Sequence, residues 1–369
     1  MSMQEKCEEL LSIADVQLGG SRPWDMQIHN DDLFNRVFSE GSLALGEGYM
    51  DGWWDAECVD QLICNLLSSD IQSKITPYKI LFLALRVKLT NLQSLKRAFQ
   101  VGEEHYNIGN RLFEIMLDRR MTYTCGYWKN ATNLDEAQEA KLDLVCKKID
   151  LKPGQHVLDI GCGWGSFAKF AAEKYGAKVT GITVSTEQAK LAQENCEGLP
   201  IDIRVQDYRA LDEKFDHIIS LGMFEHVGAK NYRTYFQKAR DCLKEDGLFL
   251  LHTIGGLYTS ETPEPWIHKY IFPNSQIPSM AEISKATEKL FVIEDMHNFG
   301  AYYDKTLMAW YENFDAGWDE LKNDYSERFY RMWKYYLLSC AGSFRARSMQ
   351  LWQLVLSKNG VQGVYERIN

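Results

Sequence analysis

Gln155-His-Val-Leu-Asp-Ile160, followed at once by Gly161-Cys-Gly-Trp-Gly165, is the stretch that decides the fold class. The first six residues are typical of a short buried strand, and the glycines after them are typical of a tight turn. Beyond the turn, Phe167, Phe170 and Ala171 fall on one face of a helix. In a doubly wound sheet, such a turn lies at the carboxyl edge of the strands, where nucleotides bind. The sequence therefore predicts a strand, a glycine turn and a helix that together hold a nucleotide-like cofactor.

The same alternation of strand and helix continues along the chain. Further apolar runs predict strands at residues 178–182, 201–205, 217–221 and 248–251. A helix before the first strand is predicted by the one-sided spacing of Leu142, Val145, Cys146 and Ile149. Ser185 with Gln188 predicts a capping box at the start of another helix. This order is typical of an α/β fold with a doubly wound, mostly parallel sheet covered on both faces. After residue 260 we expect a helical, aromatic region that covers the site.

Length, composition and charge bound the class of protein. A chain of 369 residues predicts two domains, and 45% hydrophobic with 25% charged residues is ordinary for a globular protein. No run approaches about 18 apolar residues, and residues 1–16 lack the apolar core of a secretory signal, so a cytoplasmic location is expected. The net charge of −10 argues against nucleic-acid binding. Nine scattered cysteines fit neither a disulfide framework nor a zinc ribbon, and no metal site is expected.

Residues 1–70 are expected to form a small, mainly helical N-terminal domain. Within it, the four glycines of Gly41–Trp54 predict a turn-rich loop with the tryptophan pair packed beneath it. Residues 71–102 form a basic linker segment that carries no acid. Its cations are Lys74, Lys79, Arg86, Lys88, Lys96 and Arg97. Such a segment fits docking on an anionic membrane surface, and equally a helix and linker packed on the protein's own body.

The spacing of the glycines narrows the kind of cofactor. A dinucleotide loop has the form GxGxxG, whereas here Ser166 takes the third place and the pattern is GxGxG, two residues after Asp159. That form resembles the cofactor loop of class I S-adenosylmethionine-dependent methyltransferases. The ends of the next two strands would hold ribose and adenine, although Asp207 could equally be a helix cap. The expected S-adenosylmethionine-binding residues are Tyr123, Thr124, Asp159, Gly161, Gly163, Gly165, Thr183, Gln188, Gln206, Asp207 and Tyr208.

An acid and an imidazole follow the fourth and fifth strands. Glu225 comes shortly after the strand at 217–221, and His252 directly follows the strand at 248–251. A lone histidine is commonly a satisfied core or surface group. Because the carboxyl ends of parallel strands share one edge of a sheet, however, Glu225 and His252 are expected to converge beside the cofactor loop.

Several longer strings, in one order along the chain, carry a family resemblance. They are Tyr123-Thr-Cys-Gly-Tyr-Trp128, Gly161-Cys-Gly-Trp-Gly165, Phe224-Glu-His-Val-Gly228, Pro265-Trp-Ile-His-Lys-Tyr-Ile-Phe-Pro-Asn274, His297-Asn-Phe-Gly300, Tyr303-Asp304, Leu307-Met-Ala-Trp310, Phe344-Arg-Ala-Arg347 and Gln350-Leu-Trp-Gln353. With them the chain resembles, essentially end to end, the cyclopropane-fatty-acid-phospholipid synthases in their long bacterial form with an N-terminal domain. It departs at Thr124 and Gly126, where the family often has serine and alanine.

This resemblance implies methylene transfer from S-adenosylmethionine to the cis double bond of a phospholipid acyl chain, by a catalytic domain at residues 103–369. The alkene attacks the sulfonium methyl, and a bound bicarbonate removes a proton from that methyl as the ring closes. The resemblance also implies a homodimer that attaches peripherally to the inner face of the membrane. The residues carried over as catalytic or bicarbonate-binding are Cys125, Glu225, His252, Tyr303 and the backbone of Ile254, with Cys340 near the active site.

A cationic transition state gives aromatic rings a reason to line the pocket, although packing in the core explains each ring equally well. The candidate rings are Tyr123, Trp128, Tyr270, Phe272 and Tyr303. A methyltransferase of a soluble acceptor is the nearest alternative function. A nicotinamide dehydrogenase lacks its glycine pattern here, and a non-catalytic lipid-binding protein would not need Glu225 and His252 together. Methyl branching of the acyl chain without ring closure also stays open.

Overall fold

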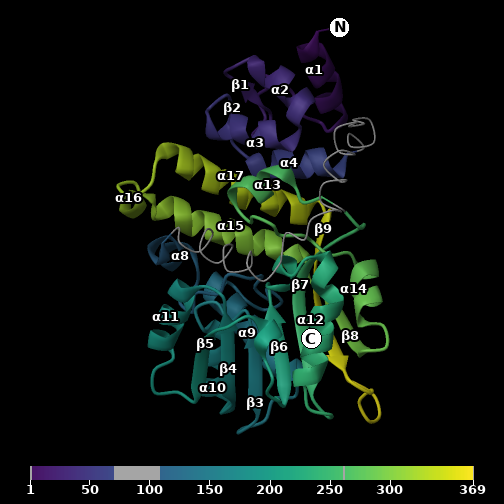
Figure 1. Ribbon diagram of the computed structural model, residues 1–369. Helices are drawn as coiled ribbons and strands as arrows, with labels where there is room; N and C mark the ends of the chain where they lie inside the picture. Colours follow the sequence, from purple (N-terminus) through teal and green to yellow (C-terminus); the bar gives the residue numbers. More distant parts are fainter. Residues whose placement is uncertain (1, 70–108, 261, 369) are drawn as a thin grey trace. The chain divides into compact units, whose positions relative to one another are not determined.

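The computed structural model describes residues 2–69, 109–260 and 262–368, drawn in colour in Figure 1. The basic segment at 71–102 lies outside the described residues, so its linker and docking roles and the domain boundary placed there stay predictions. Contacts divide the chain into two compact units. The described part of unit 1 comprises residues 2–69, 262–273 and 303–349, and that of unit 2 comprises 109–260, 274–302 and 350–368. Among the described helices, none is long and apolar enough to cross a membrane.

Unit 2 is built on a seven-stranded sheet in the order β5-β4-β3-β6-β7-β9-β8. Strands β3 to β7 run parallel to their neighbours in that order, and β8 and β9 are antiparallel to each other. The strands are β3 (His156–Ile160), β4 (Lys178–Thr183), β5 (Ile201–Val205), β6 (His217–Leu221), β7 (Leu248–Gly256), β8 (Val292–Asn298) and β9 (Met349–Ser357). The predicted α/β class with a doubly wound, mostly parallel sheet is confirmed.

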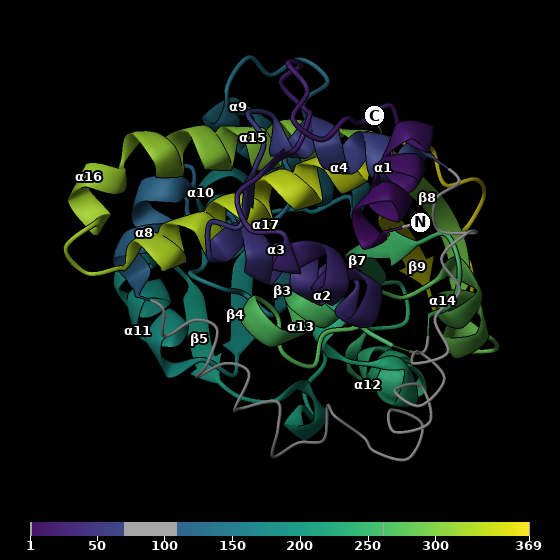
Figure 2. The ribbon, with the colours of Figure 1, turned by 90° about the horizontal axis from the view of Figure 1, so that it is seen from above.

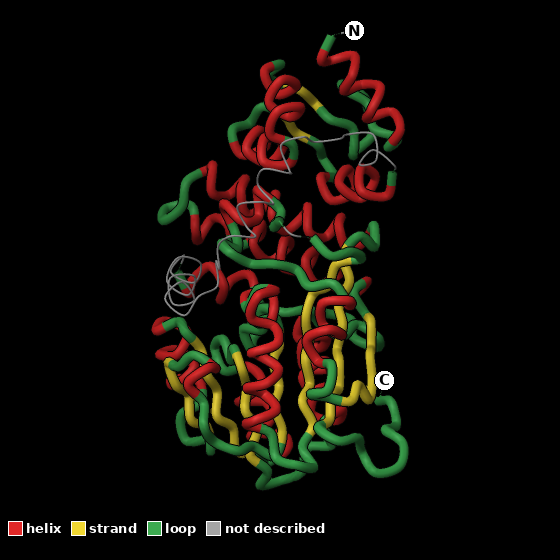
Figure 3. Tube along the Cα trace, turned by 45° about the vertical axis from the view of Figure 1, so that its right-hand side comes forward, coloured by secondary structure: helices red, strands yellow, loops and turns green. Residues whose placement is uncertain are grey.

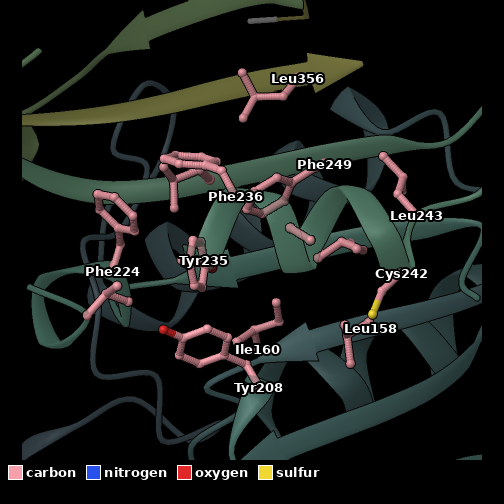
Figure 4. Close-up of a cluster of buried hydrophobic side chains, with 14 of the residues drawn as sticks. Leu158, Ile160, Tyr208, Phe224, Tyr235, Phe236, Cys242, Leu243, Phe249 and Leu356 are labelled. Atoms are coloured by element: carbon pink, nitrogen blue, oxygen red, sulfur yellow. The ribbon is translucent and has the colours of Figure 1, made fainter. Parts of the chain in front are cut away.

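Helices cover both faces of this sheet, as the red coils beside the yellow strands show in Figure 3. One face carries α9 (Leu134–Lys148) and α10 (Ser166–Tyr175), whose apolar sides share a buried cluster with β3 and β4. The other face carries α12 (Tyr232–Cys242) and α14 (Met280–Thr287). Figure 4 shows the second cluster, in which Phe236 of α12 lies beside Phe249 of β7. The remaining elements of unit 2 are α8 (Asn110–Met116), α11 (Thr186–Asn195) and the short helices η1 (Tyr208–Ala210), η2 (Phe224–His226) and η3 (Ala229–Asn231).

The region after residue 260 is not wholly helical, contrary to expectation, because it also contributes β8 and β9. Strand β8 was missed because it is an edge strand: Val292, Ile293 and Met296 are exposed and polar residues intervene, which leaves no continuous apolar run. Strand β9 is buried almost throughout, and the indole of Trp352 lies where a Cβ on Gly255 of β7 would clash with it at 2.0 Å. Its two glutamines had obscured that apolar pattern.

Unit 1 is mainly helical, with one two-stranded sheet. Figures 1 and 2 show α3 and α4 beside the long helix α17. The elements are α1 (Met3–Ile13), α2 (Asp32–Glu40), α3 (Ser42–Met50), α4 (Val59–Ser68), α13 (Pro265–Tyr270), α15 (Ala301–Ala316, of which the first two residues belong to unit 2), α16 (Trp318–Leu321) and α17 (Glu327–Arg345), with β1 (Gln27–Ile28) paired to β2 (Trp54–Asp55).

The glycine-rich stretch 41–54 is largely helix α3, which corrects the predicted loop. Glycine is unfavourable inside a helix, so its presence here calls for a close contact. A Cβ on Gly46 would lie 2.3 Å from Cδ1 of Trp266, and a Cβ on Gly48 would lie 2.6 Å from a methyl of Leu33. Trp54 is fully buried and its indole N–H donates to the Leu45 carbonyl at 2.8 Å. The glycines therefore allow a large ring to approach the helix backbone.

Candidate active site

The glycine loop after β3 offers its backbone at the carboxyl edge of the sheet. Gly161, Gly163 and Gly165 have φ angles of 85°, 54° and 84°, a region that favours glycine. A Cβ on Gly161 would meet Met223 at 2.7 Å, and one on Gly165 would meet a cysteine sulfur at 2.8 Å. At Gly163 nothing lies within 4 Å of such a Cβ. The first and third glycines thus permit tight packing, while the second leaves its side of the loop open to a ligand.

At the end of β4, hydrogen bonds join Thr183, Ser185 and Gln188 to one another. The Thr183 hydroxyl donates to Gln188 Oε1 at 3.0 Å, and the Ser185 N–H donates to Thr183 Oγ1 at 3.2 Å. Ser185 Oγ accepts from the Gln188 N–H at 3.2 Å, so Ser185 does cap α11. The predicted reciprocal half of the capping box is absent at this helix, because the Gln188 side chain bonds to Thr183 instead. The cofactor-binding roles of Thr183 and Gln188 stay predictions.

At the end of β5, Asp207 caps the short helix η1. Gln206 continues the ladder, its N–H donating to the Thr183 carbonyl at 2.9 Å. Asp207 Oδ1 accepts from the Arg209 N–H at 2.9 Å, which is the capping role considered as its alternative. The Tyr208 ring is buried, with the Arg209 guanidinium 5.1 Å from its centre. Contacts of Gln206, Asp207 and Tyr208 with a cofactor stay predictions.

A hydrogen bond joins Glu225 to the backbone of β7. Glu225 lies in η2, and its Oε1 accepts from the Ile254 N–H at 2.7 Å. His252 lies two residues earlier on β7, so its side chain and that of Ile254 share a face. The Gly222 N–H donates to the His252 carbonyl at 2.9 Å, which joins the end of β6 to the same place. The Glu225 carboxylate and the Ile254 amide therefore meet just beyond the end of β6, and His252 lies within β7, which continues to Gly256 past the predicted end at residue 251.

Burial sets the charge of these two side chains. Burial raises the pKa of Glu225 to about 7, with the Ile254 N–H opposing the rise. Burial also lowers the pKa of His252 well below its usual value, and the charges of Lys141 and Lys148 lower it further, so the imidazole is neutral. Gln353 Nε2 lies 3.2 Å from His252 Nδ1, and which ring nitrogen carries the proton depends on the tautomer.

Three polar atoms at this place are buried and lack a hydrogen-bond partner among the described residues. They are Glu225 Oε2, His252 Nε2 and Gln353 Oε1. Buried polar groups are nearly always hydrogen-bonded, so such atoms at a sheet edge indicate a ligand position. An ionised Glu225 offers an acceptor there, and the neutral His252 offers a donor or an acceptor according to its tautomer. The pair therefore suits a small polar group.

Cys125 and its neighbours lie in the same unit. The Cys125 side chain is fully buried, and its thiol donates to the Gly126 carbonyl at 3.3 Å. Thr124 adjoins the end of β6, since a Cβ on Gly222 would lie 2.6 Å from the Thr124 methyl. The Tyr123 ring centre is 5.2 Å from that of Phe113. The segment thus reaches the strand ends that carry Glu225 and His252.

Tyr303 and Cys340 belong to unit 1, so their expected roles beside Glu225 stay predictions. Tyr303 is a buried residue of α15, with its ring centre 4.5 Å from that of Phe344. Burial raises the pKa of the Cys340 thiol to about 12, so the thiol is protonated at neutral pH. A protonated thiol is a poor nucleophile, and we assign it no nucleophilic role.

Helix α9 supplies polar side chains that the sequence reasoning overlooked. Gln138, Lys141 and Lys148 are all fully buried, although each type is usually exposed. Burial raises the pKa of Asp159 to about 7, and the positive charge of Lys141 opposes that rise. The available signal was the spacing, because 138, 141, 145 and 148 follow one helix face that also carries the apolar residues.

Comparisons with known proteins identify the fold and the family of the chain. Coclaurine N-methyltransferase, bound to N-methylheliamine and S-adenosylhomocysteine, superposes with a TM-score of 0.71 at 24% identity, covering 85% of this chain and 99% of that one. The fold is that of the class I S-adenosylmethionine-dependent methyltransferases. The family model for mycolic acid cyclopropane synthetase matches residues 93–354. The chain belongs to that family.

The chain is also similar to two cyclopropane synthases. The cyclopropane-fatty-acyl-phospholipid synthase of Escherichia coli strain K12 is 53% identical over 357 residues, 96% of this chain and 94% of that protein. The mycolic acid cyclopropane synthase CmaA1, in a structure with S-adenosylhomocysteine and CTAB, is 31% identical with a TM-score of 0.67. That match covers 70% of this chain and 98% of the other.

Proposed function

We propose that this protein transfers a methylene group from S-adenosylmethionine to the cis double bond of unsaturated phospholipid acyl chains and closes a cyclopropane ring. The observation that carries the proposal is the 53% identity with the Escherichia coli cyclopropane-fatty-acyl-phospholipid synthase, which extends over 96% of the chain. The similarity to a cyclopropane synthase with bound S-adenosylhomocysteine supports the co-substrate. The open side of the glycine loop at Gly163 supports this loop as the place where the co-substrate binds.

The reaction needs no nucleophilic side chain from the protein, because the alkene itself is the nucleophile. The alkene carbon forms a bond to the sulfonium methyl, whose bond to sulfur breaks, and the other alkene carbon becomes cationic. Loss of a proton from the transferred methyl then supplies the electron pair that closes the ring. The protein must align these carbons and exclude water that would trap the cation. The buried, neutral imidazole of His252 adds no positive charge beside that cation.

We further propose that bicarbonate binds at Glu225 and His252, with Cys125, Tyr303 and the Ile254 backbone as the other expected ligands. When bound, this ion supplies the base that takes the proton of the transferred methyl. What supports the proposal is the chemistry of the two side chains: Glu225 Oε2 can accept its hydroxyl proton, and His252 Nε2, in the tautomer that carries the proton there, can donate to an oxygen. Glu225, with its pKa raised to about 7, is also suited to receive a proton near neutral pH.

We propose peripheral attachment to the cytoplasmic face of the membrane, because the substrate double bond lies inside a bilayer. The six cations of residues 71–102, in a chain of net charge −10, support an electrostatic contribution. Reversing the charges of Lys96 and Arg97 to glutamate should weaken binding to anionic vesicles, more so at low salt. The exposed pair Lys174 and Lys178, changed in the same way, is the matched control. Equal binding by wild type and the first variant would remove this docking proposal.

A homodimer is a further prediction, which rests on the family resemblance and which sedimentation of the purified protein tests. The function itself is tested by incubating the protein with methyl-labelled S-adenosylmethionine and vesicles of an unsaturated phospholipid. Label in the acyl chains, as a ring that mass analysis distinguishes from a methyl branch, is the expected result. Label on a soluble acceptor, with none in lipid, would instead indicate a small-molecule methyltransferase.

A further inference from the structure

Lys141 of helix α9 has a buried ammonium group that hydrogen-bonds to the segment before Cys125. Lys141 Nζ donates to Thr124 Oγ1 at 2.7 Å, although the lysine side chain is fully buried. One turn earlier, Gln138 Nε2 donates to the carbonyls of Thr124 at 2.7 Å and of Thr122 at 3.3 Å. Burying an ammonium group costs free energy unless it is paired. Its retention here indicates a role that an apolar side chain could not fill.

The same helix also holds the chain on the far side of Cys125. The Ala137 carbonyl accepts from the Tyr127 N–H at 2.8 Å. A Cβ on Gly126 would lie 2.9 Å from that of Ala137, so glycine allows this close approach. Cys125 is therefore fixed between two anchors on α9, one before it and one after it.

The opposite side of the segment meets the strand ends. The Thr124 methyl lies beside Gly222, whose N–H donates to the His252 carbonyl at 2.9 Å. Thr124 is thus enclosed between Lys141 and the ends of β6 and β7. A change in its position would move Cys125 relative to Glu225 and His252.

Charged and titratable groups from several elements surround the ammonium. Asp118 precedes the segment, Cys125 lies on it, Asp159 comes from β3 and His252 from β7. Burial lowers the pKa of Lys141 to about 8, and attraction by Asp118, Cys125 and Asp159 opposes that fall. At neutral pH the group is mainly charged, which makes its hydrogen bond to Thr124 a strong one.

We propose that Lys141 is a positioning residue of the reaction, which through the Thr124 hydroxyl fixes the segment carrying Cys125 against the strand ends carrying Glu225 and His252. The inference rests on the proposed function, and it adds a residue that the proposed function does not itself require. Lys141 acts through Thr124, without contact with the reacting carbons.

A double-mutant cycle on the full-length protein tests this role. Lys141→Met keeps most of the unbranched side chain and removes the donor, while Thr124→Val keeps the shape and removes the acceptor. Each change should lower kcat for ring formation roughly ten- to hundredfold, the range for a hydrogen bond to a charged group. The double variant should be no slower than the slower single variant, because both remove one interaction. Lys147→Met on the same helix, at a side chain that is 55% exposed, is the matched control.

Thermal melting and S-adenosylhomocysteine binding separate positioning from stability. We expect kcat to fall far more than the KM for S-adenosylmethionine, in protein with the wild-type circular dichroism spectrum. A Lys141→Met kcat within about threefold of wild type, or losses that multiply in the double variant, would overturn the inference. If Lys141→Met does not fold, Lys141→Gln takes its place, and a normal kcat for Thr124→Val again overturns it. Wild-type protein that forms no ring refutes the proposed function itself, whatever the variants do.

Discussion

Glu225→Gln is the substitution that bears most directly on the chemistry. The amide oxygen can still accept from the Ile254 N–H, which lies 2.7 Å from Oε1 in the wild type. The change is therefore confined to Oε2, the buried oxygen that lacks a partner among the described residues. There the substitution replaces an acceptor with an amide donor. The site also loses the group that can take a proton near pH 7.

The size of the effect follows from these losses. A hydrogen bond to a charged group contributes about 1.5–3 kcal/mol, which corresponds to roughly ten- to hundredfold in rate. Proton transfer by a positioned base typically contributes roughly 10²–10⁴ in rate. We therefore expect kcat for ring formation to fall at least about a hundredfold. Cofactor affinity should change little, because the Glu225 carboxylate is hydrogen-bonded to the backbone of β7.

The assay measures transfer of label from S-adenosylmethionine to vesicle lipid, beside calorimetric titration with S-adenosylhomocysteine. Glu194→Gln, at an exposed acid of α11, is the matched control and should behave as wild type. The wild-type rate should rise as pH passes through about 7, where Glu225 ionises, and the variant should lose that dependence. Near-normal turnover by Glu225→Gln, in a protein that binds S-adenosylhomocysteine normally, would refute the assignment.

Three further outcomes are expected from purified variants followed by thermal melting. Since burial raises the pKa of folded Glu225 from 4.5 to about 7, wild type loses stability as pH rises through 7, and Glu225→Gln should be more stable by about 1–3 kcal/mol at pH 8 but not at pH 4. Gly46→Ala should destabilise by about 1–3 kcal/mol, because its Cβ would lie 2.3 Å from Trp266; an unchanged melt would contradict that packing. Gly165→Ala should cost about 1–2 kcal/mol at its φ of 84° and weaken S-adenosylhomocysteine binding, and unaltered binding would argue against this loop as the cofactor site.

The sheet and its glycine loop were predictable because their signals are local. Each parallel strand from β3 to β7 is a short apolar run, and the glycines follow the first of them directly. The hydrogen bond from the Ile254 N–H to Glu225 fits the rule that the carboxyl ends of parallel strands share an edge. The predicted strand end at residue 251 was wrong, because β7 continues to Gly256 and holds His252 within it.

The rest depended on contacts between residues far apart in the chain. Gly46 is acceptable in a helix only because Trp266, more than two hundred residues later, packs against it. Lys141 on an apolar helix face could be taken for a surface lysine until Thr124 was seen beside it. Gln353 Nε2 lies 3.2 Å from His252 Nδ1, on a strand whose polar residues obscured its apolar pattern. No local sequence pattern encodes such pairs.

The central claim is that a methyl group enters the lipid and leaves one of its protons behind. S-adenosylmethionine bearing a fully deuterated methyl group, incubated with the protein and unsaturated phospholipid vesicles, tests it directly by mass analysis of the acyl chains. Ring closure predicts that two of the three deuterium atoms remain, in a chain that has gained a cyclopropane carbon. A lipid product that keeps all three deuterium atoms as a methyl branch, or no deuterium in lipid at all, would contradict the account.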